Sequence, residues 1–128
     1  MGAFMKAWIS LSSIFLCLAV VAGAFGAHAL KHKMDPYLMT VYEKAVLYQV
    51  IHSFGIFFVA ILPALSFLSE QVAIRICAVF LVGICIFSGS LYALTLSGIL
   101  RLGMITPLGG AALIVGWLYL AIAVYRGR

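Results

Sequence analysis

Charged residues are scarce in this chain, and their scarcity excludes a water-soluble fold. Only 9% of the 128 residues are Asp, Glu, Lys or Arg, whereas 66% are hydrophobic. Soluble domains carry about 25% charged residues, so the eight basic and three acidic side chains here cannot cover the surface of a soluble body. The composition therefore indicates an integral membrane protein with no room for a soluble domain.

Cysteine pairs and clustered basic residues are lacking as well. Cys17, Cys77 and Cys85 fall inside apolar stretches without CxxC spacing, which argues against a disulfide framework. The net charge of +5 comes from lysines and arginines scattered at the ends of those stretches, as is usual near lipid headgroups. No aromatic-basic patch accompanies them. We therefore expect the lipid bilayer as a partner and no nucleic acid.

Four long stretches without a single charge organise the chain. They cover residues 7–30, 45–69, 76–100 and 102–125, and each is longer than the about 20 residues that a helix needs to cross the hydrocarbon core. The expected fold class is an all-α integral membrane protein with four transmembrane helices in an antiparallel bundle. The chain is then a single transmembrane domain, residues 1–128, that crosses the cell membrane several times. The expected helices cover about 7–30, 36–68, 72–97 and 106–126.

Proline and capping residues mark some of these helix ends. Asp35-Pro36 and Thr106-Pro107 each place an N-cap residue before a proline at the first helical position. Pro63 is expected to end or to kink the second helix.

The first charge-free stretch, residues 7–30, also has the sequence features of a signal peptide. Lys6 supplies a positive start, residues 8–21 an apolar stretch, and Ala27-His28-Ala29 a small-x-small cleavage site. The apolar stretch is longer than a usual signal peptide has, so we expect this segment to remain as a membrane helix.

Small residues recur at helical spacing and predict close helix packing. Small-xxx-small spacing lets two backbones approach in lipid, where apolar burial cannot drive association. The expected packing residues are Ala19, Gly23 and Ala27 in the first helix and Gly109, Gly110 and Gly116 in the last. A unit this small is not expected to bury all of them internally, so we predict a homo-oligomer.

Polar residues concentrate at one side of the expected bundle. In an antiparallel arrangement the end of helices one and three meets the start of helices two and four, and the opposite half is almost wholly apolar. The predicted polar pocket is formed by His28, Tyr48, Gln49, His52, Ser88, Ser90, Tyr92 and Thr106. Polar groups at membrane depth are costly unless paired or hydrated, which makes them functional candidates. The same residues could instead hydrogen-bond one another and hold the bundle together.

His28 is expected to face the second helix in this pocket. An unpaired polar group at the membrane boundary costs about 1–3 kcal/mol, so the imidazole needs a partner. Gln49, Tyr48 and Ser90 are the expected partners, and His28 and His52 are expected to line one polar site.

Two chemical alternatives use the same residues. His28, His32 and His52 could ligate haem iron or zinc, but His32 lies between two lysines and few carboxylates are near. Ser88 and His52 could act in hydrolysis, but they lack an oriented acid partner and a nucleophile-elbow motif. We therefore expect no catalytic residues, no metal and no cofactor.

Four motifs in order along the chain resemble one known family. They are GAFGAHAL at 23–30, Y-Q-x-x-H at 48–52, FSGSLY at 87–92, and TPLGG followed by GW at 106–117. They are similar to the small membrane proteins classed as domain of unknown function 423, which include the transmembrane protein 256-like proteins. The resemblance implies a small multi-pass membrane protein and no activity that can be carried over.

The function predicted is that of a non-enzymatic membrane protein of uncharacterised activity. The working hypothesis is that the one-sided polar pocket binds or passes a small molecule or ion. The alternative is a structural or assembly subunit that packs on partners through small-residue helix faces. The count of basic residues that predicts orientation is tied at four on each side, and we expect cytoplasmic termini because Glu43 offsets Lys44 and Asp35 offsets Lys33. The termini side has Lys6, Arg75, Arg126 and Arg128, and the opposite side has Lys31, Lys33, Lys44 and Arg101.

Overall fold

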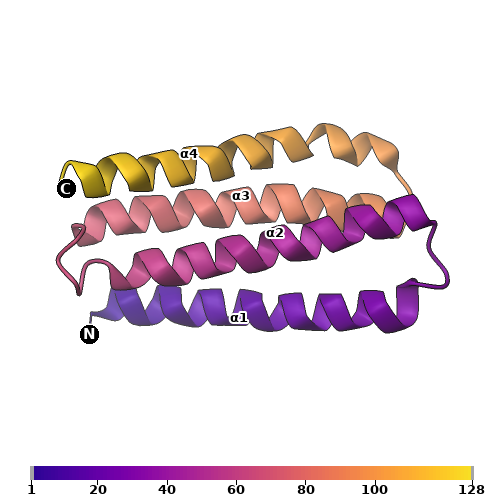
Figure 1. Cartoon of the computed structure of the whole chain (residues 1–128), viewed down its shortest axis with the longest axis horizontal. Helices are drawn as coiled ribbons and strands as arrows, with labels where there is room; N and C mark the ends of the chain where they lie inside the picture. The colour runs from indigo at the N-terminus through magenta and orange to yellow at the C-terminus, as the bar shows by residue number, and fades with distance from the viewer. Residues whose placement is uncertain (1, 128) are drawn as a thin grey trace.

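Four long helices form the computed structural model, which describes residues 2–127 (Figure 1). All four helices, with the short segments that extend them, are long and apolar enough to cross a membrane. The prediction of an all-α bundle with four membrane spans is therefore confirmed. Met1 and Arg128, which the predicted domain and the basic-residue count include, lie outside the described residues. The helices are α1 (Ala3–Phe25), α2 (Pro36–Ile61), α3 (Glu70–Ser97) and α4 (Thr106–Tyr125), with a π-helical segment η1 (Gly26–Leu30) after α1 and a 3₁₀ segment η2 (Leu100–Met104) before α4.

The helices run alternately up and down, with α2 and α3 at the centre. α1 contacts mainly α2, and α4 contacts mainly α3 (Figure 1). Both chain termini therefore lie at one end of the bundle, and the connections 31–35 and 98–105 lie at the other. We call these the terminal end and the loop end.

The hydrophobic core is concentrated toward the terminal end. Its largest fully buried side chains are Phe80, Ile76 and Cys77 of α3 with Ile56 and Val59 of α2. Each of these is buried completely, so the interior between α2 and α3 is tightly packed in this half of the bundle.

Local chemistry explains most of the helix ends. The carboxylate of Asp35 accepts from the amides of Tyr37 (2.9 Å) and Leu38 (3.4 Å), which caps α2 as its N-cap–proline motif predicts. α2 ends at Ile61 rather than near residue 68, because Pro63 has no N–H to continue the ladder. Thr106 is the first residue of α4 and not its cap, because η2 leads into α4 with helical backbone at Ile105.

Candidate functional site

Glycines join α4 to α3 by close steric fit. A Cβ placed on Gly116 would lie 2.6 Å from Cε1 of Phe80, and one on Gly109 would overlap the backbone of Phe87. Gly110 is less crowded, since its Cβ would lie 3.6 Å from Cδ2 of Phe87. All three predicted packing residues of α4 therefore lie against α3 of the same chain.

The small residues of α1 face α2, with one exception. Ala19 is buried and a Cβ on Gly23 would lie 3.7 Å from Cγ1 of Val46. Ala27 is exposed, so its predicted place in this interface is wrong. Steps of four residues rotate about 40° each around a helix, so the row 19–23–27 leaves the interface, whereas the seven-residue step from Ala19 returns to Gly26. Gly26 is buried, and a Cβ there would lie 2.6 Å from Cε1 of Tyr42.

The predicted polar residues lie on two different faces of the central helix pair. Gln49, Ser88 and Tyr92 gather where α1, α2 and α3 meet. Tyr48 and His52 instead pack against aromatic rings of α3 and α4. Neighbouring helical residues point about 100° apart, which sends Tyr48 and Gln49 to different sides of α2.

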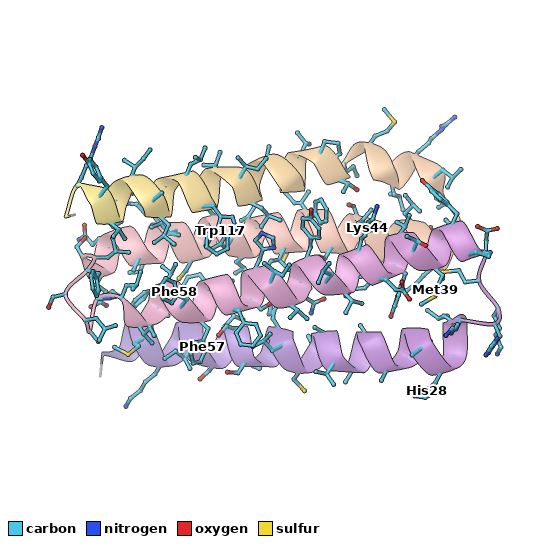
Figure 2. All side chains as sticks on the ribbon, in the orientation of Figure 1. His28, Met39, Lys44, Phe57, Phe58 and Trp117 are labelled. Carbon is cyan, nitrogen blue, oxygen red and sulfur yellow. The ribbon has the colours of Figure 1, made fainter. Side chains whose placement is uncertain are left out.

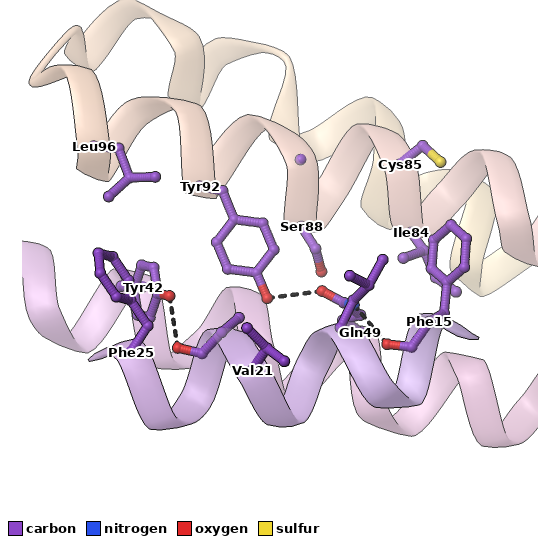
Figure 3. A pocket seen from close by; sticks show the side chains of 13 residues that line it. Phe15, Val21, Phe25, Tyr42, Gln49, Ile84, Cys85, Ser88, Tyr92 and Leu96 are labelled. Atoms are coloured by element: carbon purple, nitrogen blue, oxygen red, sulfur yellow. Dashed lines mark hydrogen bonds between the residues drawn. The ribbon is translucent and has the colours of Figure 1, made fainter. Parts of the chain in front are cut away.

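A hydrogen-bond network ties the first group to backbone carbonyls (Figure 3). Gln49 Nε2 donates to the carbonyl of Phe15 (2.8 Å), while its Oε1 accepts from the hydroxyl of Tyr92 (2.8 Å). Ser88 donates to the carbonyl of Ala45 (2.7 Å). These bonds connect α1, α2 and α3 through Gln49, which is only 6% exposed.

Tyr42 completes this network and was missed by the sequence analysis. Its hydroxyl donates to the carbonyl of Ala22 (2.7 Å), and its ring meets that of Tyr92 edge to face, with 5.4 Å between centroids. The signal that could have found it is spacing, because Tyr42 lies seven residues before Gln49 and so on the same helix face.

A groove of about 430 Å³ opens beside this network, between α1 and α3 (Figure 3). Tyr42 and Gln49 contribute to it from α2. Apolar side chains of α1 form one wall, and small or polar residues of α3 form much of the other. The groove is lined by Phe15, Leu18, Val21, Ala22 and Phe25 from α1 and by Ile84, Cys85, Ser88, Gly89, Tyr92 and Leu96 from α3.

The second group, Tyr48 and His52, belongs to an aromatic cluster. His52 Nδ1 lies 2.7 Å from the carbonyl of Tyr48, and its ring lies 5.9 Å from that of Phe80 and 6.1 Å from that of Trp117. Tyr48 stacks on Phe87 at 4.3 Å. Nearer the loop end, the hydroxyls of Ser90 and Thr106 are hydrogen-bonded at 2.6 Å and link α3 to α4.

His28 lies apart from both groups, so its expected contact with α2 is wrong. The side chain is exposed on η1 and points away from α2 (Figure 2). Gly26, two residues earlier, occupies the face that meets α2, and a two-residue step turns a side chain to the far side of a helix. Exposure to solvent and headgroups leaves the imidazole without need of a protein partner.

The structure does not bring together the described residues that a metal or haem site, or a hydrolytic site, would need. Within residues 2–127 no three His, Cys, Asp or Glu side chains are grouped as a metal site. His28 is exposed, whereas His52 lies among the aromatic rings of α3 and α4. Ser88 donates to a backbone carbonyl instead of meeting His52.

Comparison with known proteins places the chain in a family. The family model described as a protein of unknown function (DUF423) matches residues 22–110, which include Tyr42, Gln49, Ser88 and Tyr92 of the network but neither Phe15 nor Trp117. A UPF0382 membrane protein of Staphylococcus saprophyticus is 41% identical over 125 residues, covering 95% of this chain and 99% of its own length. The UPF0382 membrane protein YwdK of Bacillus subtilis is 40% identical over 123 residues, covering 95% and 98%. No solved structure matches. The chain belongs to the DUF423 family of membrane proteins.

Proposed function

We propose that the protein is a non-catalytic module of the cell membrane that binds one lipid-like molecule in the groove between α1 and α3. The observation that carries this is the groove itself, about 430 Å³ with apolar walls and a hydrogen-bonded polar floor. Small-molecule sites usually measure about 300–1,000 Å³ and combine apolar walls with a few placed polar groups. The dimensions and lining therefore suit an apolar chain that carries a small polar group.

The direction of the hydrogen bonds indicates which polar group fits. A backbone carbonyl only accepts, so the groove-facing Gln49 must turn its NH₂ toward Phe15 and its oxygen toward Tyr92. The hydroxyl of Tyr92 must then donate to Gln49, which leaves the Tyr92 oxygen free only to accept. Gln49 keeps one amide hydrogen to donate. A hydroxyl or a primary amide on the ligand satisfies both, since each group donates and accepts.

Binding is favoured over the passage of an ion because an ion would meet no charged side chain among the groove residues. The interior toward the terminal end is a packed hydrophobic core, in which Phe80, Ile76 and Ile56 are completely buried.

Photolabelling with a diazirine-bearing C16 alcohol in detergent tests the proposal. The parent protein should be labelled on α1 and α3 next to the groove. Gly89→Leu should lose the label, because a Cβ at Gly89 meets nothing within 4 Å and the larger side chain fills the groove without a clash. Ala93→Leu, on the exposed face of the same helix, is the matched control and should be labelled like the parent. Equal labelling of Gly89→Leu and the parent would contradict the proposal.

A second candidate, an assembly subunit, is favoured by the closed network. Tyr42, Gln49, Ser88 and Tyr92 already bond within the chain, so an apolar helix from a partner or a second copy could cover the groove without polar groups of its own. In that case Gly89→Leu changes the oligomeric mass measured by native mass spectrometry, and the alcohol does not label the parent. The glycines that led us to expect a homo-oligomer do not support it, because they pack inside one chain.

A further inference from the structure

A second cavity, of about 580 Å³, lies at the loop end between α2, α3, η2 and the start of α4. It is separate from the groove, because it opens on the side of α2 that faces α4. Its walls are apolar, and Lys44 is its one charged residue, with no carboxylate in the lining. The remaining lining residues are Tyr37, Val41, Phe87, Leu91, Leu94, Leu100, Gly103, Thr106 and Pro107.

Lys44 reaches this cavity because of its place on α2. Tyr37, Val41 and Lys44 are spaced by four and three residues and therefore share one helix face. That face turns toward α3 and α4 (Figure 2). The neighbouring acid, Glu43, is exposed and does not line the cavity.

The depth of Lys44 follows from the helix that lies beside it. α4 begins at Thr106 and has 20 residues, which at 1.5 Å per residue span about 30 Å. This equals the thickness of the hydrocarbon core. With α4 placed across that core, Thr106 and Pro107 lie at one of its edges, and Lys44, which lines the same cavity, lies near that edge.

We propose that this cavity binds an anionic phospholipid, with Lys44 holding the phosphate and Leu91, Leu94 and Phe87 contacting an acyl chain. The charge favours an anion, since a lysine near the membrane surface contributes about 1 kcal/mol to binding anionic lipid. The apolar walls favour a lipid over free phosphate, because the cavity extends along α3 beyond the reach of a headgroup. The Tyr37 hydroxyl adds a hydrogen-bond donor in the same lining, whereas the Thr106 hydroxyl is already bonded to Ser90.

Native mass spectrometry of the protein from nanodiscs that contain phosphatidylglycerol and phosphatidylcholine tests this assignment. The parent should retain phosphatidylglycerol preferentially. Lys44→Gln should lower that preference about five-fold, which is the factor that about 1 kcal/mol represents. Lys33→Gln, which removes an exposed lysine in the loop at the same end, should leave it unchanged, and Lys44→Arg should preserve it.

Two results would overturn the proposal. One is equal loss of phosphatidylglycerol from the Lys33→Gln and Lys44→Gln variants, which would indicate general surface charge. The other is displacement of the lipid by an equal concentration of glycerol phosphate, which would show that the acyl chain contributes nothing. Unfolding of Lys44→Gln in pure phosphatidylcholine nanodiscs should match the parent, so that a folding defect is not mistaken for lost binding.

Discussion

The two outer helices, α1 and α4, contact the central pair through different kinds of interaction. α4 meets α3 through Gly109 and Gly116, whose missing side chains admit Phe87 and Phe80. α1 meets α2 through two side chains, Tyr42 and Gln49, that donate to its backbone carbonyls. Close packing and interhelical hydrogen bonds are the main attractions between helices in lipid. Glycine contacts predominate at α4, where one hydrogen bond joins Ser90 to Thr106, whereas α1 with η1 combines two hydrogen bonds with the contact of Gly26 on Tyr42.

The difference indicates which junction can open. A steric fit is lost abruptly when one atom is added, because packed backbones do not yield. A hydrogen-bonded junction loosens in small steps, since each interhelical bond contributes about 0.6 kcal/mol on average. The groove lies on the α1 side, so the helix that borders the proposed ligand is also the one whose hydrogen-bonded junction can loosen in small steps.

Gly109→Ala should have the largest effect on stability. The added Cβ overlaps the backbone of Phe87, and such overpacking costs about 1–3 kcal/mol or more. Gly110→Ala is the neighbouring control, because its Cβ makes an ordinary contact. Reversible unfolding in mixed SDS micelles measures both. If the two variants unfold alike, the steric account of the α3–α4 junction is wrong.

Gln49→Leu should destabilise the protein by about 1 kcal/mol, from two lost interhelical bonds. One of these bonds joins α2 to α1 and the other joins α2 to α3. Hydrogen exchange should then rise in α1 while α4 stays protected. Gln71→Leu, on the exposed start of α3, controls for the change in polarity. A rise in α4 exchange equal to that in α1 would remove the distinction between the two junctions.

Ser53→Ala should stabilise the protein slightly, by up to about 1 kcal/mol. Ser53 Oγ is the buried side-chain atom that has no hydrogen-bond partner among the described residues, and an unpaired buried polar group carries a desolvation cost. Ser13→Ala, at an exposed serine that bonds the carbonyl of Ile9, should not stabilise. A loss of stability in Ser53→Ala would show that the hydroxyl has a role that its contacts do not reveal.

His28→Ala should change the free energy of unfolding by less than about 0.5 kcal/mol, as exposed substitutions usually do. His32→Ala is expected to behave the same way. A markedly larger effect of His28→Ala, measured in the same micelles, would restore the sequence-based interpretation that this histidine has a partner within the bundle.

The four-helix architecture could be predicted because the thickness of the lipid bilayer sets the length of the helices that cross it. Charge-free stretches of at least 20 residues become spanning helices, and alternating spans place the polar ends of the helices together. Which face each polar residue takes could not be predicted, since Tyr48 and Gln49 are adjacent and both are polar. The face that each residue takes depends on the rotation of α2 about its own axis. Two close contacts, of Tyr42 with Gly26 and of Trp117 with Gly55, set that rotation. The four-residue spacing in the sequence also predicted Ala27 at the interface with α2, a place that Gly26 takes in the structure.

The chain carries two tryptophans, and each outer helix has one. Trp8 on α1 lies beside Phe4, and Trp117 on α4 lies 4.8 Å from the ring of Phe80 (Figure 2). Replacing either one by phenylalanine leaves a single tryptophan, whose emission, excited at wavelengths where the six tyrosines do not absorb, reports on one helix alone. The protein thus has its own optical probes, and the emission of the two single-tryptophan forms during titration with detergent can follow the departure of α1 and α4 separately.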